Sequence, residues 1–387
     1  TAEPLTLLSA NDGETRFLRT ATGFEQACAD DSFTVIQLGP NHPPITKTVA
    51  GQTPNTICGS PYIAITQDGR YGFVANHGWR DTLFVKDIQN AVPAEHLAQV
   101  LSVIDLRCKD PMVSDQVQLP GDCWMIDLHP DGDKVIVGVG SSLHIYRVQN
   151  RQLSRVARVQ APGPVFCFDV SPKGDNLILV TVETEDDVPV AQLHVLRIKG
   201  NSITHPRRLR AADGLGPIDK GFSPRISPDG KTALVPHGFG IGGKGTLDDV
   251  LVVDLTLKRP AVTQRLRQVA DGIESLAFHP CGEFAVICCL QTGLDRTKTS
   301  HLATVDLTKR PVRVLNYLPI EPVPEGIEFS PDRTQLFVQT TFANHIVVFR
   351  VDGMNLIREP FVLPTGYGPS SLAISRRWTD STCCGGG

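Results

Sequence analysis

A turn followed by a strand recurs along this chain, and the recurrence limits its fold more than any other feature of the sequence. The stretch "HPDGDKVIVGVG", beginning at residue 129, has a Pro-Asp-Gly turn and then a run of β-branched residues. Pro fixes φ near −65° and Gly accepts a positive φ, so these residues favour a tight reversal. Val and Ile then favour a strand. Similar stretches begin near residues 66, 171, 227, 279 and 330.

The spacing of these turns predicts one four-stranded antiparallel sheet per repeat. Successive turns are separated by between 42 and 63 residues, close to the ~40–50 residues of one propeller blade. A second strand-like run follows each turn, such as "LHIYRV" at 143 and "VLVVDL" at 250, and no convincing amphipathic helix intervenes. The turn positions are Gly69, Gly132, Gly174, Gly230, Gly282 and Arg333, and a degenerate seventh copy ends at Trp378.

Seven turn positions predict seven blades, of which the last is incomplete. Its inner strand lies within residues 368–376, and the chain ends soon afterwards. Residues 14–50 contain strand-like runs without a turn, and we expect them to supply the missing outer strands, because an unclosed ring leaves a sheet edge unpaired. The expected fold is all-β, a seven-bladed β-propeller closed by pairing N-terminal strands with the C-terminal blade. It would form a single domain over residues 1–378, with a disordered tail over 379–387.

The charge, the apolar runs and the cysteines of the sequence limit the partners and the compartment that we expect. The 387 residues carry a net charge of −4 and no strongly basic segment, so we expect neither nucleic acid nor membrane as a partner. No apolar run approaches the roughly 18 residues of a membrane span. Of the ten cysteines, Cys167, Cys288 and Cys289 lie in strand-like runs and are expected to be reduced and buried. This favours the cytoplasm, with export after removal of a leader as the alternative.

The repeats resemble those of a known superfamily. Stretches of the form "SPDGK" plus an apolar strand, followed by runs such as "VLVVDL", are similar to the lactonase-type (YVTN-repeat) seven-bladed propellers. That superfamily includes sugar-lactone hydrolases and a muconate-cyclising enzyme. The resemblance implies a small-molecule enzyme that needs no cofactor and acts on a lactone or an unsaturated carboxylic acid. We expect a monomer or weak homo-oligomer.

Counting from the turns places a set of candidate catalytic residues at one mouth of the central channel. Two consecutive repeats have a carboxylate eight residues before the turn, Glu274 and Glu325. Two repeats have a "HG" pair after the second strand, at His77 and His237. One histidine would move a proton, and a glutamate would orient it or act as partner acid. Arg225 would hold a carboxylate or a developing oxyanion.

Further residues at or beside these positions are candidates for substrate binding. Some are aromatic and would form a funnel at the channel mouth, and the others are polar or cationic. No spacing of ligands suggests a metal site. The candidate substrate-binding residues are Asn76, Arg80, Trp124, Phe166, Lys220, Phe222 and Phe239.

Other functions stay open at this stage. A non-catalytic scaffold would bind a protein or ligand on the same face, and the polar residues would then be ordinary hydrogen bonds between blades. A calcium-dependent lactonase, with Glu274, Glu325 and Asn76 as oxygen ligands, ranks lower. Hydrolysis, lactonisation and cyclisation would use the same residues, and no GxSxG, HExxH or nicotinamide-binding motif separates them.

Overall fold

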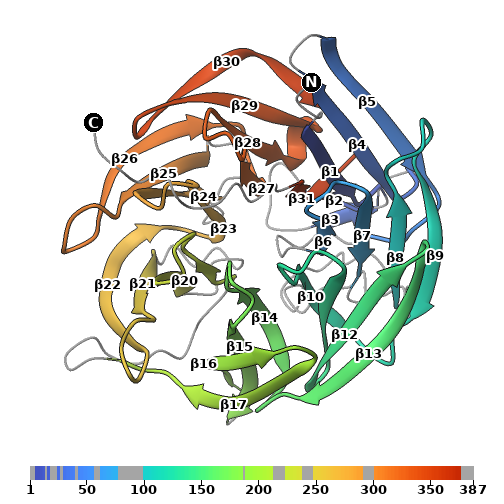
Figure 1. Cartoon of the computed structure of the whole chain (residues 1–387). Helices are drawn as coiled ribbons and strands as arrows, with labels where there is room; N and C mark the ends of the chain where they lie inside the picture. The colour runs from blue at the N-terminus through green and yellow to red at the C-terminus, as the bar shows by residue number, and fades with distance from the viewer. Residues whose placement is uncertain are drawn as a thin grey trace.

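Within the residues that it describes, the computed structural model contains seven β-sheets arranged in a ring around a central axis (Figure 1). Each sheet is one blade of a β-propeller, and in blades 1 to 6 the strand nearest the axis is the first of its four in sequence. The all-β, seven-bladed prediction is therefore confirmed. The described residues are 5–13, 15–17, 24–26, 29–39, 42–55, 62–76, 99–185, 188–211, 223–237, 247–290 and 300–375.

The strands follow the same order, from the axis outward, in the first six blades. Blade 1 contains β6 (Ile63–Ile65), β7 (Tyr71–Ala75), β8 (Val100–Asp105) and β9 (Met112–Gln118). Blade 2 contains β10 (Cys123–Leu128), β11 (Lys134–Val139), β12 (Ser142–Gln149) and β13 (Gln152–Gln160). Blade 3 contains β14 (Val165–Val170), β15 (Asn176–Glu185), β16 (Val188–Lys199) and β17 (Ser202–Arg208).

The remaining blades complete the ring. Blade 4 contains β19 (Arg225–Ile226), β20 (Thr232–His237), β21 (Asp248–Asp254) and β22 (Ala261–Ala270), with β18 (Arg210–Ala211) outside β22. Blade 5 contains β23 (Ile273–Phe278), β24 (Phe284–Cys289), β25 (Ser300–Asp306) and β26 (Arg313–Ile320). Blade 6 contains β27 (Pro324–Phe329), β28 (Gln335–Thr340), β29 (His345–Asp352) and β30 (Asn355–Pro364).

Blade 7 joins the two ends of the described chain, as expected. Its order from the axis is β31 (Pro369–Ile374), β1 (Leu5–Asn11), β4 (Ser32–Gly39) and β5 (His42–Ala50). The expectation that residues 14–50 supply all the outer strands was wrong in one respect. Leu5–Asn11 pairs with β31, because its apolar run can fill a buried strand.

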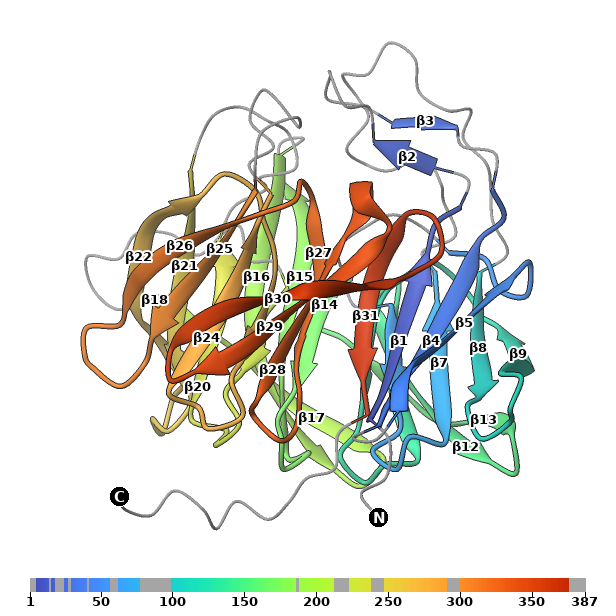
Figure 2. The same ribbon diagram turned by 90° about the horizontal axis from the view of Figure 1, so that it is seen from above.

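The run from residue 15 forms a separate hairpin instead. Its strands, β2 (Thr15–Phe17) and β3 (Phe24–Gln26), pair only with each other. Figure 2 shows this hairpin standing beyond one end of the ring. This is the end at which the innermost strands begin, because the chain leaves β1 there opposite Pro369.

The turns predicted from the sequence close the first hairpin of blades 1 to 6, and the seventh predicted position, Trp378, lies outside the described residues. Positive φ angles occur at every one of the six described positions. In blade 4, the Ser227 hydroxyl donates to Asp229 (2.7 Å) and accepts the Thr232 N–H (3.0 Å). The φ values are 68° at Gly69, 87° at Gly132, 68° at Gly174, 74° at Gly230, 77° at Gly282 and 72° at Arg333.

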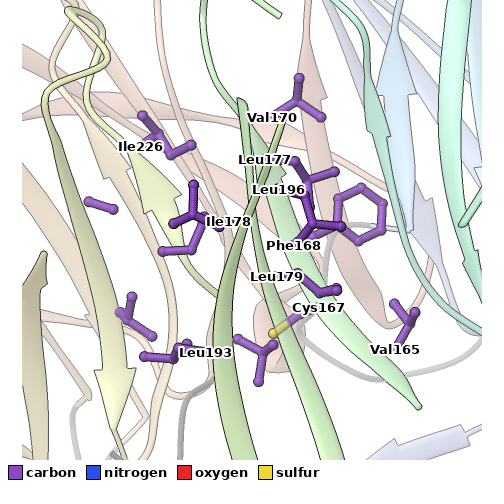
Figure 3. Packing of buried hydrophobic residues seen from close by; sticks show 14 of the residues in the cluster. Val165, Cys167, Phe168, Val170, Leu177, Ile178, Leu179, Leu193, Leu196 and Ile226 are labelled. Carbon is purple, nitrogen blue, oxygen red and sulfur yellow. The ribbon is translucent and has the colours of Figure 1, made fainter. Parts of the chain in front are cut away.

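The core lies between neighbouring blades. In Figure 3, Phe168 and Leu179 of blade 3 and Ile226 of blade 4 belong to one such apolar cluster. Burying each side chain of this size contributes roughly 1.5–3 kcal/mol. The prediction for the cysteines is confirmed, since Cys167, Cys288 and Cys289 are buried free thiols. In the described part of the chain, no helix is long and apolar enough to cross a membrane.

Candidate functional site

The innermost strands of five blades share a break in pairing near their first residue. In blade 2 the register moves from Cys123 to Met125, which leaves Trp124 out of the ladder. Such β-bulges re-aim side chains and are enriched beside active sites. The bulged positions are Trp124 in blade 2, Phe166 in blade 3, Glu274 with Ser275 in blade 5, Glu325 with Gly326 in blade 6, and Ser370 in blade 7.

In the bulged blades the second strand reaches the level of the bulge, and only in blade 3 does it continue beyond, to Glu185. In blades 3 and 5, for example, Val165 pairs with Thr181 and Ile273 pairs with Cys289. His237 is the corresponding last residue of β20, and Asn76 follows β7 at the same position. Both side chains are buried. The structure therefore brings His237 and Asn76 to the end of the channel that holds the bulges.

Glu274 and Glu325 occupy equivalent bulges in adjacent blades. Their exposed fractions are 1% and 2%. The Ser275 hydroxyl donates to the Glu325 carbonyl and links the two bulges. Burial raises the pKa of the Cys288 thiol well above its usual value, and the charges of Glu325 and Glu274 contribute to this rise. Both carboxylates therefore lie within electrostatic reach of a single thiol, at the junction of blades 5 and 6.

The bulges of blades 2 and 3 carry aromatic rings. The Trp124 and Phe166 ring centroids are 5.7 Å apart, with the rings tilted by 50°. They form a wall on a different part of the ring from the two glutamates. The other predicted site residues, His77, Arg80, Lys220, Phe222 and Phe239, lie outside the described residues.

Arg225 lies farther along the channel and has a structural partner. Its Nη1 is 3.1 Å from Asp169 Oδ1, and Asp169 Oδ2 accepts the Ile226 N–H at 2.6 Å. Asp127 likewise accepts the Val170 N–H of the next blade at 2.7 Å. These two aspartates, five residues before the turn, connect the innermost strand of blade 2 to that of blade 3 and the innermost strand of blade 3 to that of blade 4. To bind a substrate, the Arg225 guanidinium would have to contact both Asp169 and the substrate, or break its ion pair with Asp169. A role of Arg225 in substrate binding therefore stays a prediction.

Asp248 is a titratable group that the sequence reading missed. It begins β21 and accepts the Ile273 N–H at 3.4 Å, directly before the bulge at Glu274. Burial raises the pKa of the Asp248 carboxyl to about 6, and the charges of Asp271 and Asp249 add to the rise. The only sequence signal was its position, at the same end of blade 4 as His237. Among the described residues, no group of three or more His, Cys, Asp or Glu side chains could hold a metal ion.

Comparison with known proteins relates the whole ring to solved structures. No family model and no curated protein matches the sequence. A Bacteroides fragilis protein, provisionally described as a 6-phosphogluconolactonase, superposes with a TM-score of 0.66 at 14% identity, covering 97% of this chain and 98% of that one. The periplasmic gluconolactonase of Pseudomonas aeruginosa gives 0.61 at 17% identity, with coverages of 96% and 99%. The chain has the fold of the lactonase-type propellers.

The lactonase-type fold does not by itself select a reaction. Hydrazine synthase of Kuenenia stuttgartiensis also superposes, with a TM-score of 0.60 at 16% identity, covering 84% of this chain and 92% of that one. The same seven-bladed ring therefore occurs in proteins that are not described as lactonases. The residues of the site, and not the fold, decide which reaction is possible.

The Asp248 carboxyl is expected to make the stability of this seven-bladed propeller depend on pH. A carboxyl with a raised pKa binds its proton more tightly when folded, so the wild-type protein loses stability as the pH rises from about 3.8 to about 6. Asp248→Asn removes this loss. We expect the variant to gain on the order of 2 kcal/mol relative to wild type between pH 4 and pH 8. Urea unfolding of both proteins at several pH values measures the difference, and a difference independent of pH would contradict the assignment.

Proposed function

We propose that this protein is a hydrolase that opens a small lactone at the bulged end of its channel, without a cofactor. The main support for this proposal is the pair of buried carboxylates, Glu274 and Glu325, at equivalent bulges of adjacent blades. His237 lies at the same end and supplies a group that can exchange a proton near neutral pH. Support comes from two solved structures of this fold that are described as lactonases.

The proposed reaction uses these groups as general base and general acid. One carboxylate, alone or through His237, takes a proton from water as its oxygen bonds to the lactone carbonyl carbon. The carbonyl oxygen becomes an oxyanion. Its collapse breaks the ring C–O bond, and the leaving ring oxygen takes a proton from the second acid. The product is the open hydroxy acid, and both catalytic groups are ready for another cycle after proton exchange with water.

The aromatic wall would position the substrate for this attack. Trp124 and Phe166 offer apolar surface against which the carbon face of a lactone ring can pack. Such packing leaves the ester group free to turn toward the polar residues. Holding the reacting groups in one geometry accelerates a reaction without any new chemical group.

A lactone panel tests the proposal. The intact protein is incubated with small aliphatic and sugar lactones in a pH-stat, with and without a chelator, and a muconate serves as an unsaturated acid. We expect hydrolysis of at least one lactone, at a rate that the chelator leaves unchanged. Turnover lost on chelation would favour the calcium-dependent alternative, and cyclisation of muconate alone would favour a cyclase. No turnover of any compound would contradict the proposal and favour a non-catalytic scaffold.

A further inference from the structure

The charge on the outer strands differs sharply between blades. The two outer hairpins of blades 2 and 3, residues 142–160 and 188–208, contain eight Arg or Lys and no Asp or Glu. The outer pairs of blades 1, 4, 5 and 6 mix both signs, and that of blade 7 has a single basic residue, Lys47. The outer strands of blades 2 and 3 are therefore basic although the whole chain has a net charge of −4.

Most of these cations lack an acidic partner among the described residues. Arg147 pairs with Asp133 and Arg151 pairs with Asp105. The other six are exposed and form no ion pair with another described residue. We call these six the basic flank: Arg155, Arg158, Arg197, Lys199, Arg207 and Arg208. The strands β13 and β17 that carry four of them lie in contact at the rim (Figure 1).

Strand β13 differs from the other outer strands because basic side chains alone guard its edge. Natural sheets guard their edges with proline, charge or a covering segment. Proline occurs in β5, β17, β26 and β30, β9 contains Asp115, and β18 covers β22. Strand β13 has nine residues, no proline, no acid and no strand beyond it in the described chain. Each outer pair contains a β-bulge, so bulges do not set β13 apart.

The chain itself shows that a blade edge can accept another strand. In blade 4, β18 pairs in parallel with β22 through Arg210–Ala261 and Ala211–Val262. On β13, blade 1 occupies only the beginning of the edge, where Asp115 accepts the Leu153 N–H at 2.7 Å. Among the described strands, β13 is hydrogen-bonded in a ladder only to β12, so none of them adds to its edge from Arg155 to Gln160.

We propose that β13 is a docking site for an extended acidic segment of a partner protein, which adds to the sheet as a fifth strand. Main-chain hydrogen bonds to the edge would supply affinity, and carboxylates on the segment would pair with the basic flank. A polypeptide fits better than a nucleic acid, because only a polypeptide can satisfy the strand edge. Edge protection by repulsion alone would explain the arginines but not the absence of proline.

Short peptides test both parts of this proposal. The probe is a fluorescein-labelled (Glu-Thr)6 peptide. The control peptide, (Glu-Pro)6, has equal charge, but its prolines remove half of the N–H donors and favour polyproline II over a β-strand. The proteins are wild type, Arg155→Glu/Arg158→Glu, and a matched control, Arg267→Glu/Lys309→Glu, whose exposed cations lie on blades 4 and 5. Fluorescence anisotropy at low and moderate salt gives each Kd, and thermal melting checks that all three proteins fold.

We expect (Glu-Thr)6 to bind wild type at least about tenfold more tightly than (Glu-Pro)6, with an affinity that falls as salt rises. The Arg155/Arg158 variant should lose at least about tenfold, and the control variant should stay within about twofold of wild type. Equal binding of the two peptides would overturn strand addition. Equal losses in the two variants would overturn the assignment to β13. Tighter binding of an unlabelled dT12 competitor than of the peptide would point to nucleic acid instead.

Discussion

Replacing Glu274 by Gln is expected to lower the turnover number for lactone hydrolysis by roughly 10²–10⁴-fold. Gln keeps the shape of the side chain but cannot accept or deliver the proton that the proposed reaction moves. The carboxylate is almost fully buried, so a neutral replacement relieves a desolvation cost and the fold should tolerate it. Steady-state kinetics on the best lactone of the panel, next to thermal melting of the same preparation, measures both effects.

A variant with both glutamates replaced shows whether Glu274 and Glu325 act together in catalysis or contribute to turnover independently. If Glu274 and Glu325 act as one unit, Glu274→Gln/Glu325→Gln should be little slower than the worse single variant. His237→Ala should lose activity in the same range. Unchanged turnover in the Glu274 variant, or a large loss of stability with turnover per folded molecule retained, would show that these residues hold blades together instead.

Deleting residues 1–50 is expected to abolish the folded monomer. The deletion removes β1, β4 and β5, three of the four strands of blade 7, and leaves β31 with an open edge. Leu7, Leu8, Phe33 and Ile36 are fully buried, and each contributes roughly 1.5–3 kcal/mol. Their sum is comparable to the whole stability of a typical domain, about 5–15 kcal/mol.

Size-exclusion chromatography and calorimetry measure this loss. The truncated protein should elute as aggregate and show no cooperative transition. The control replaces β2 and β3 with a short Gly-Ser linker, because these strands pair only with each other. It should remain a folded monomer. A soluble truncation that melts cooperatively would mean that the ring does not depend on this closure.

The repeat made the fold predictable from the sequence. Each of the five described turn glycines has the positive φ that was expected of it, and Arg333 has one as well. Counting back from the turns also found the bulged positions, because the innermost strands are built alike. The strand Leu5–Asn11 was missed because no turn precedes it, and nothing local says that it pairs with residues more than 360 positions away.

The site was less predictable, because its properties arise between blades. The Arg225–Asp169 ion pair joins side chains 56 residues apart, and the partner of Arg225 depends on how two blades face each other. Asp248 has a raised pKa because of burial against blade 5, which no single repeat reveals. The net charge of the whole chain did not reveal the basic flank, because acidic residues elsewhere outnumber these cations.

The most direct test of the proposed site compares two glutamates on the same strand. Glu325 lies at the bulge of β27, and Glu328 is buried three residues later, at the level where Asp127 and Asp169 connect neighbouring blades. The measurement is turnover per folded molecule, with melting temperature, for Glu325→Gln and Glu328→Gln. We predict that Glu325→Gln loses turnover by roughly 10²-fold or more and melts near wild type, whereas Glu328→Gln melts earlier and keeps its turnover. The reverse pattern, or equal turnover in both variants, would contradict a catalytic role for the bulged carboxylates.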